Sequence, residues 1–322
     1  MKGFSRLILG LLCMAAVGML LYRYLKQGEM GEERFRLPEK WAEELGAEEL
    51  LESAEGLLEN AGTLMEGLLD EYTGFEGYDI DDATMFEKAY PVLEGEVIQT
   101  VELEGIRELD VEIGGCAMEI LVSESREGRV ESENAGKLQV YREEDTLNIK
   151  ATRKAQEDAG ECLIRLYLPA GYDWKEVMLE VGAGSIRVES LQAQSAKLQT
   201  GVGKMEAEGV NATQLELMAG AGEISLRNVD TVRLKAEVGV GTITVQGNVQ
   251  ETVEANCAVG KIKLMLAGQE TDFNYELSGV IGSIALAGMR YDEKIEEKKI
   301  NNGAKKWMDL DCSVGNIEII FP

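Results

Sequence analysis

The sequence predicts a mainly β protein built as a parallel β-solenoid, and three observations carry this prediction. A short glycine phrase recurs at a constant step of 19 residues, its second glycine falling at Gly184, Gly203, Gly222, Gly241 and Gly260. Apolar and polar residues alternate on both sides of each phrase. Outward positions one step apart carry opposite charges. A fixed period of about 20 residues is typical of stacked repeats.

Each repeat is predicted to be a strand, a glycine corner, a second strand and a short turn. Around Gly222, for example, the apolar residues are Leu217 before the glycine and Ile224 and Leu226 after it. Alternation with a period of two indicates a strand with one buried face. The parity changes at the glycine, as expected at a corner or bulge, where glycine tolerates unusual backbone angles.

One outward column tests whether the coils stack in parallel. It reads Lys197, Glu216, Lys235 and Glu254 at successive steps. Parallel coils about 4.8 Å apart favour such alternation, because unlike charges become neighbours. The step therefore predicts side-by-side parallel strands at Ser185–Glu189, Lys204–Glu208, Glu223–Arg227 and Thr242–Gln246.

Residues 1–27 are predicted to be an N-terminal membrane anchor. Leu7 to Tyr22 holds no charge, and basic residues lie on either side of it. Because long basic side chains can reach the membrane surface, this segment is just long enough to cross a bilayer as one transmembrane helix. Two alternatives are a cleaved signal peptide, using the small residues Ala15, Ala16 and Gly18, and a lipoprotein signal at Cys13. The basic start favours an uncleaved signal anchor, with a cell-membrane location and the C-terminal domain outside the cell.

Residues 28–95 are predicted to be an acidic helical segment followed by a linker. The apolar residues of a heptad seam are Ala47, Leu50, Ala54, Leu57, Ala61, Leu64 and Leu68. Such an amphipathic helix needs a partner surface. It would cover the end of the solenoid, because open sheet edges must be blocked, or it would serve self-association or binding of a protein partner.

Residues 96–322 are predicted to form the solenoid repeat domain. Residues 109–121 read as a degenerate copy of the phrase with Cys116 at the corner, and later copies surround Gly282 and Gly315. Between those two lies an insertion rich in Lys and Glu, from Met289 to Lys306. Insertions in repeat proteins map to surface loops, so this one is a candidate binding or capping feature.

Composition restricts the function. The net charge is −27 and the chain has no histidine. A strongly acidic protein is a poor partner for nucleic acid, whose phosphates need a basic surface. Without histidine, the commonest general base, the Ser-His-Asp systems and most zinc sites are absent. No catalytic, cofactor-binding or metal-ligating residues are predicted.

The cysteines are interpreted as small buried hydrophobes rather than as a disulfide framework. Cys116 occupies a corner position and Cys162 lies among apolar residues. Cys257 and Cys312 share one offset from the glycine but are expected to lie two coils apart. That spacing would be about 10 Å, which is beyond bridging distance.

The outward columns after the glycine argue against a polysaccharide-acting β-helix enzyme. Such enzymes need facing carboxylates in a groove. No two adjacent repeats place carboxylates together in these columns, which hold, for instance, Arg187, Glu206 and Ser225 in succession.

Three features together resemble the bacterial β-strand-repeat family labelled "putative adhesins", a domain of unknown function. They are Ile106-Arg-Glu-Leu-Asp-Val-Glu-Ile113, the Leu166-Tyr-Leu-Pro-Ala-Gly171 turn and the serial glycine phrases. The resemblance covers roughly residues 105 to 322. It implies a membrane anchor before the repeats, mostly Gram-positive relatives and no catalytic residue. Some relatives are linked with cell-envelope stress responses.

The function expected from the sequence is that of a non-enzymatic, membrane-anchored, adhesin-like cell-surface protein presenting a binding or scaffolding surface, with a cell-wall polymer or glycan as ligand. The alternative is an envelope-stress sensing or regulatory component acting through a membrane signalling partner, which the heptad helix would contact. A polysaccharide-acting enzyme is the less favoured third hypothesis.

Overall fold

The computed structural model describes residues 85–87, 89–153, 160–279, 282–291 and 295–322. The chain divides into two units, Met1–Asp79 and Ile80–Pro322, and every described residue belongs to the second. The predicted anchor at residues 1–27 and the predicted heptad helix lie outside the described residues. Within the described part, no helix has the length and apolar character to cross a membrane.

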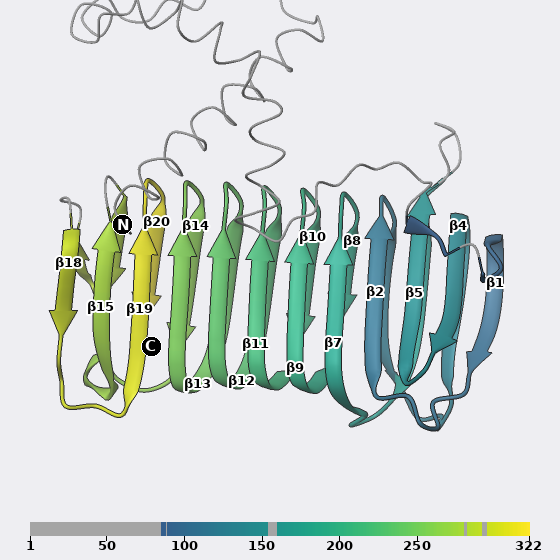
Figure 1. Cartoon of the computed structure of the whole chain (residues 1–322), viewed down its shortest axis with the longest axis horizontal. Coiled ribbons are helices and arrows are strands. Elements are labelled where there is room, and N and C mark those ends of the chain that lie inside the picture. The colour runs from purple at the N-terminus through teal and green to yellow at the C-terminus, as the bar shows by residue number, and fades with distance from the viewer. Residues whose placement is uncertain (1–84, 88, 154–159, 280–281, 292–294) are drawn as a thin grey trace, which may run out of the picture. The chain divides into compact units, whose positions relative to one another are not determined.

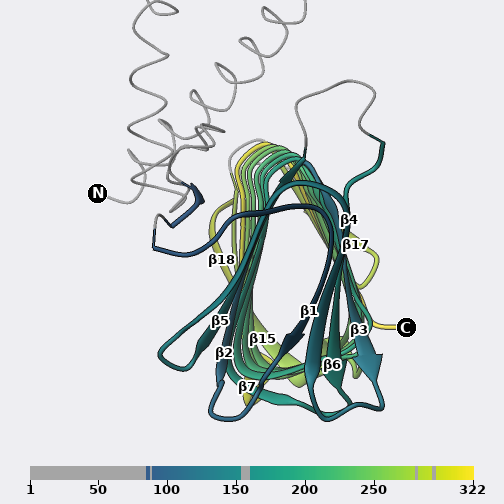
Figure 2. The ribbon, with the colours of Figure 1, turned by 90° about the vertical axis from the view of Figure 1, so that its right-hand side faces the viewer.

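The second unit is mainly β, as predicted, and its strands form two facing layers around one apolar core (Figure 2). In spatial order the first layer contains β5 (Thr146–Arg153), β2 (Glu108–Gly114), β7 (Asp173–Val181), β9 (Leu191–Thr200), β11 (Val210–Ala219), the second parts of β12 (Glu223–Val238) and β13 (Thr242–Cys257), β19 (Lys306–Cys312) and β15 (Phe273–Gly279).

The second layer runs alongside it. In spatial order it contains β6 (Leu163–Pro169), β3 (Ala117–Ser123), β8 (Ser185–Val188), β10 (Lys204–Glu208), the first parts of β12 and β13, β14 (Lys261–Leu266), β20 (Asn316–Ile320) and β16 (Ser283–Leu286).

The middle of the stack follows the predicted register. Met205 pairs in parallel with Ile186 on one side and with Ile224 on the other, and Ile224 pairs with Ile243. The prediction of parallel neighbours at a step of 19 residues is therefore confirmed here. These four side chains are at most 1% exposed, because alternate residues of each strand face the core.

The corner glycines are required by close stacking and not by an unusual backbone conformation. None of the five glycines that define the step has a positive φ, so the conformational reason expected from the sequence is wrong. Thr242 N donates a hydrogen bond of 2.9 Å to Gly222 O of the preceding coil. A Cβ at Gly241 would lie 2.1 Å from that same oxygen, which no side chain can do without moving the corner.

At both ends, the coils do not follow chain order, so the prediction of one continuous solenoid is wrong there. The coil of β2 and β3 lies between the coil of β5 and β6 and that of β7 and β8. At the other end, the coil of β19 and β20 lies between that of β13 and β14 and that of β15 and β16. Figure 1 shows β2 between β5 and β7, and β19 between β13 and β15.

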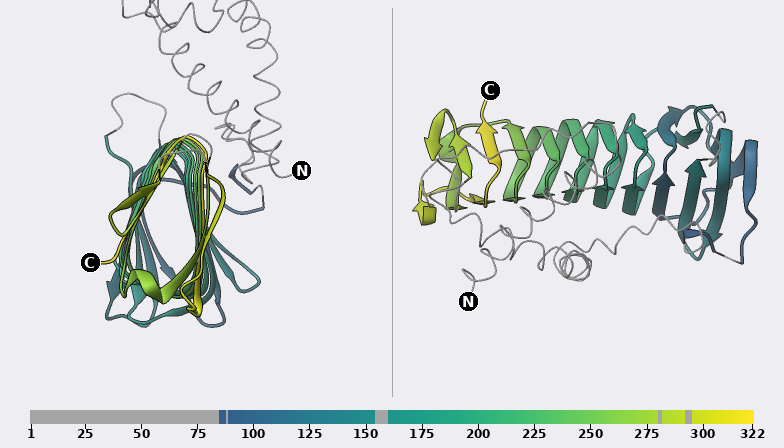
Figure 3. Two further views of the ribbon diagram at one scale, coloured as in Figure 1. Left: turned by 90° about the vertical axis from the view of Figure 1, so that its left-hand side faces the viewer. Right: turned by 90° about the horizontal axis from the view of Figure 1, so that it is seen from above.

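Antiparallel strands close both ends of the stack. At one end, β4 (Gly128–Glu143) pairs with both β5 and β6, and β1 (Leu93–Val101) pairs with β4. At the other end, β17 (Met289–Tyr291) and β18 (Ile295–Ile300) pair with β16 and β15 (Figure 3). The insertion at residues 289–306 thus supplies capping strands, which confirms the capping alternative for it.

The cysteine interpretation is wrong in two respects. Cys116 and Cys162 form a disulfide with a Cα–Cα distance of 4.8 Å, because β3 and β6 are neighbours. Cys257 and Cys312 are free buried cysteines in register on neighbouring strands, β13 and β19, and not two coils apart. Both errors arise from taking spatial order to be chain order.

Candidate functional site

The outer faces of the two layers are the candidate functional surfaces, because stacking in register lines up outward side chains in columns. On the first layer the predicted column is present, with Lys197, Glu216, Lys235 and Glu254 on neighbouring strands. Lys235 Nζ lies 3.5 Å from Glu216 Oε1. The alternation predicted from the sequence is therefore confirmed at these four positions.

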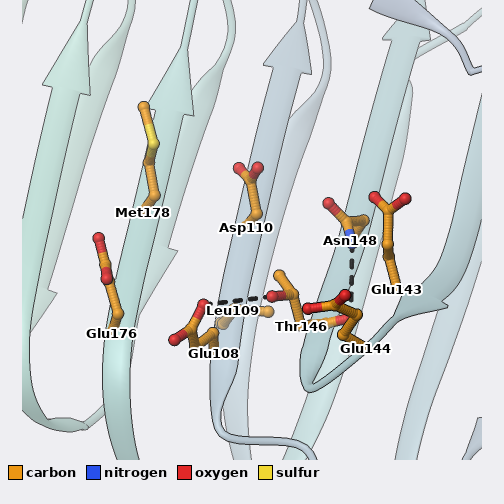
Figure 4. A pocket seen from close by; sticks show the side chains of 9 residues that line it. All are labelled: Glu108, Leu109, Asp110, Glu143, Glu144, Thr146, Asn148, Glu176 and Met178. Atoms are coloured by element: carbon orange, nitrogen blue, oxygen red, sulfur yellow. Dashed lines mark hydrogen bonds between the residues drawn. The ribbon is translucent and has the colours of Figure 1, made fainter.

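The first layer also carries a shallow groove of about 410 Å³ near the β1 end of the stack (Figure 4). We call it the acidic groove, and its lining residues are Glu108, Leu109, Asp110, Glu143, Glu144, Thr146, Asn148, Glu176 and Met178. They come from β2, β5 and β7, from the end of β4 and from the turn between β4 and β5. Five of the nine are carboxylic acids.

Strand register places Asp110 at the centre of the acidic groove. Asp110 points away from the core because its neighbours in sequence, Leu109 and Val111, are buried. In register, it lies between Asn148 on β5 and Met178 on β7, and the three side chains lie side by side in Figure 4. One step along the strands, Glu108 and Glu176 are neighbours, which places two carboxylates together.

Burial dominates the electrostatics at the centre of this face. It raises the pKa of Asp110 above its usual value, and Lys150 opposes part of that shift. Burial likewise raises the pKa of Glu112, two residues further along β2, although Lys150 Nζ lies 3.5 Å from its carboxylate. Ionised Asp110 and Glu112 therefore lack full compensation, and a cationic group arriving at this face would supply it.

Glu108 has the opposite environment. The hydrogen bond from Lys175 is the largest effect and lowers the pKa of Glu108. Thr146 Oγ1 also donates to Glu108 Oε2 at 3.3 Å. The neighbours of Glu108 within the protein thus favour its ionised form, whereas burial disfavours the ionised form of Asp110 in the same groove.

The outer face of the second layer carries a ladder of alternating charges, and the intercalated coils complete it. Arg165 on β6 lies 3.1 Å from Glu119 on β3 and 2.6 Å from Glu133 on β4. Glu119 in turn pairs in register with Arg187 on β8. In chain order the two arginines would be neighbours, so placing β3 between them separates like charges.

At the opposite end of the second layer, an intercalated strand also places opposite charges beside each other. Lys263 on β14 has Glu318 on β20 as its neighbour, at 3.6 Å, and Lys261 lies 3.3 Å from the same carboxylate. In chain order the next coil would place Ala285 there instead. The intercalated strand therefore brings the opposite charge to both lysines.

The stacked glycine corners form a third surface, a shallow groove of about 450 Å³. Val202 and Val240 stand on it with 69% and 37% of their surface exposed. Ala183 and Ala221 hold the equivalent positions in neighbouring coils. The corners thus present a narrow apolar row bordered by Lys204 and Glu223.

The chain enters the repeats across the outer face of the first layer. Gln139 on β4 is fully buried although it points away from the core. Its amide accepts from Glu87 N at 2.9 Å and donates to Glu87 O at 2.7 Å and to Tyr90 O at 2.9 Å. Tyr90 stacks on Tyr141 with ring centroids 3.9 Å apart. We call this contact the Gln139 clamp.

Sequence reasoning assigned no site residues and missed the acidic groove. The outward positions of β2 are readable from its alternation, but Glu176 becomes a neighbour of Glu108 only because β2 lies against β7. In the outward columns after the glycine, Glu206 has Arg187 and Ser225 beside it in the register, and Glu318 has Lys263 and Ala285. Among the described residues, no cluster of acids and cysteines is arranged to hold a metal ion.

The fold and these surfaces define a class of protein: a β-repeat domain with broad, charged outer faces. The chain belongs to the Toastrack DUF4097 family, which matches residues 106–320, so the family likeness seen in the sequence is confirmed.

Two solved structures are similar to the chain. One is a "putative cell adhesion protein" from Clostridium sporogenes, with 13% identity and a TM-score of 0.34, over 71% of this chain and 100% of that chain. The other is a "putative adhesin" from Bacteroides fragilis, with 15% identity and a TM-score of 0.41, over 71% and 98% of the two chains. No curated protein matches the chain.

Proposed function

We propose that this protein is a non-enzymatic, membrane-anchored cell-surface protein whose repeat domain, a β-solenoid in its middle, presents a binding or scaffolding surface. The observation that carries the proposal is the stacking of coils in register, which aligns outward side chains across many neighbouring strands. Aligned columns suit a ligand with repeating groups, such as a cell-wall polymer or a glycan. Membership of the Toastrack family agrees with this role.

The ligand of the acidic groove would carry cationic groups, since Asp110 is partly desolvated and not fully compensated. The test is co-sedimentation of a fragment beginning at residue 80 with purified cell wall. We expect binding that weakens with salt and falls in an Asp110→Asn, Glu176→Gln variant. The matched control is Glu206→Gln on the other layer, which should bind normally. Equal binding by both variants would remove the groove from the proposal.

We place the repeat domain outside the cell, after a single-pass anchor at residues 1–27 and the acidic segment at 28–95. The Cys116–Cys162 disulfide supports this compartment, because disulfides persist in oxidising environments and are rare in the cytosol.

The test of location uses cells stripped of their wall. The protein should stay with membranes through carbonate washing, and added protease should remove the repeat domain from intact cells. A secreted product beginning near Met19 would mean that the apolar segment is a cleaved signal peptide. Full protection from protease would place the domain in the cytoplasm and end the cell-surface proposal.

The alternative function is envelope sensing through a membrane signalling partner that contacts the predicted heptad helix. A pull-down from membranes with the full chain and with a chain lacking residues 29–84 separates the two. The deletion ends at residue 84 so that the Gln139 clamp, which uses Glu87 and Tyr90, is kept. A partner lost with the deletion supports sensing, and retention of all partners supports the surface-binding role.

A further inference from the structure

Two cysteine pairs lie at the two places where coil order departs from chain order. Cys116 and Cys162 join the intercalated coil of β2 and β3 to the coil of β5 and β6. Cys257 and Cys312 lie where the intercalated last coil, β19 and β20, meets the coil of β13 and β14. The described cysteines thus all occupy the junctions of displaced coils.

The second pair has the geometry that bridging requires. Cys257 and Cys312 are direct partners in the parallel register of β13 and β19. Direct neighbours on adjacent strands are separated by about 4.8 Å, which lies within the usual Cα–Cα range of disulfides. Both side chains point into the core, with exposures of 3% and 0%.

The absence of side chains at two corner glycines, Gly282 and Gly315, makes room for the two sulfur atoms. A Cβ at Gly315 would meet Cys257 Sγ at 2.5 Å, and a Cβ at Gly282 would meet Cys312 Sγ at 2.5 Å. The Cys257 thiol donates to Gly260 O at 3.1 Å. The two sulfurs are therefore enclosed side by side with no bulky residue between them.

The pairing depends on the observed coil order. Gly279 on β15 holds the position equivalent to Cys312, and it pairs with Cys312 in the register. If the coils followed chain order, β15 would take the place beside β13, and Gly279 would be the neighbour of Cys257. Cys257 and Cys312 meet only when the last coil lies between the coil of β13 and β14 and that of β15 and β16.

We propose that Cys257 and Cys312, which are both free thiols in this structure, are oxidised to a second disulfide bond, which fixes the C-terminal coil in its place between β13 and β15. The bond would stabilise the observed coil order relative to the order in which the coils follow the chain. This role does not depend on which ligand the outer faces bind.

The reaction is a two-step thiol–disulfide exchange with a disulfide donor, either an oxidised dithiol protein or a low-molecular-weight disulfide. The Cys257 thiol loses its proton, and its thiolate attacks one donor sulfur, breaking the donor disulfide and releasing one donor thiolate. Deprotonated Cys312 then attacks Cys257 Sγ of the mixed disulfide and releases the second donor thiolate. The two cysteines lose two electrons and two protons, and the donor is reduced to two thiols.

Because both cysteines are buried in the folded protein, the exchange must begin during folding. A closed core excludes the donor, so the first attack takes place before the last coil has docked. The second attack, by Cys312 on Cys257, then takes place as docking brings β19 into register with β13.

The test is mass spectrometry on the full chain isolated from membranes without reductant, with free thiols blocked by N-ethylmaleimide. We expect a linked peptide pair containing Cys257 and Cys312. Alkylation of both residues in molecules whose Cys116–Cys162 bond is intact would overturn the proposal. If both pairs are reduced as isolated, the chain is refolded with oxidised glutathione, and failure of Cys257 and Cys312 to link then overturns it.

A stability measurement covers the case in which linkage is partial. The Cys116→Ser, Cys162→Ser variant retains only the second pair among the described cysteines. We expect reductant to lower its thermal midpoint by several degrees. The same chain with Cys257→Ser added should no longer respond. An equal response in both, or in neither, contradicts the second bond.

Discussion

The middle of the repeat domain and its two ends are built from the same kind of two-stranded coil, but they differ in the order in which neighbouring coils are stacked. From β7 to β14, the successive coils lie side by side in chain order, at a step of 19 residues. At each end, a coil is inserted between two others, and antiparallel strands close the stack. The glycine phrase therefore determines the strand–corner–strand structure of each coil, but it does not determine which coils lie side by side.

Charge pairing and cysteine pairing both agree with the coil order observed at the ends. Glu119 separates Arg165 from Arg187, Glu318 accompanies Lys261 and Lys263, and each displaced coil brings a cysteine beside another cysteine. These contacts join residues distant in sequence, so they cost more chain entropy to form than contacts between successive coils. The middle should thus respond most to changes in its core, and the ends to changes in their long-range contacts.

The largest effect is expected in the middle. Replacing Ile243 or Ile224 with Asp buries a charge at a position that is fully enclosed, which should cost about 5 kcal/mol or more and unfold the repeats. The control is Thr244→Asp, which points outward beside Lys263 and should fold normally. Circular dichroism and the soluble fraction report both. A soluble, equally stable Ile243→Asp protein would contradict the assigned core face.

The next effect concerns the end formed by β2 to β6. Breaking Cys116–Cys162 with serine at both positions frees a loop with a sequence separation of 46. The chain-entropy relation gives a loss of about 4 kcal/mol, measured by denaturant unfolding. Each single serine variant should match the double variant, since either breaks the bond. A loss confined to one single variant would show that packing, and not the bond, is responsible.

A smaller effect on stability is expected when an arginine is placed at the end of the second layer's outward column, compared with one placed at Ser225 in its middle. Glu119→Arg would place three arginines in a row with Arg165 and Arg187, and we expect a loss of about 1 kcal/mol at low salt. Added salt should recover most of it, because exposed charges are screened. Ser225→Arg, beside Glu206 and Thr244, is the control and should be near neutral. Equal losses in both variants would mean that charge does not govern the order.

Much of this fold could be predicted from the sequence, for a physical reason. Strand alternation, the glycine corners and the parallel register of the middle depend on residues within one or two coils, where periodicity is direct evidence. Ile224, Ile243 and the Lys197–Glu216–Lys235–Glu254 column illustrate this.

The ends could not be predicted in the same way, because their order depends on contacts that a repeat pattern does not encode. The displaced position of β19 made Cys312 a neighbour of Cys257, and that of β2 brought Glu108 beside Glu176. Charge alternation was the available signal. Testing each possible neighbour of Glu119 would have favoured a position between Arg165 and Arg187.

The smallest effect compares two carboxylates on the same face of β2. Burial raises the pKa of Asp110, so its ionised form costs stability at neutral pH, and that cost disappears as pH falls through the raised value. Lys175 lowers the pKa of Glu108, so this group contributes stability above the ordinary Glu value, which is lost as pH falls through its lowered value.

Asp110→Asn should therefore stabilise the protein at pH 7 and have no effect near pH 3, whereas Glu108→Gln should destabilise it at pH 7. Both changes should stay within about 0.5 kcal/mol, as is usual for surface positions. Denaturant midpoints at several pH values measure them. The opposite signs are the critical result: a loss of stability in both variants at neutral pH would mean that ionised Asp110 is compensated within the protein, and the acidic groove would then have no unmet charge to offer a cationic ligand.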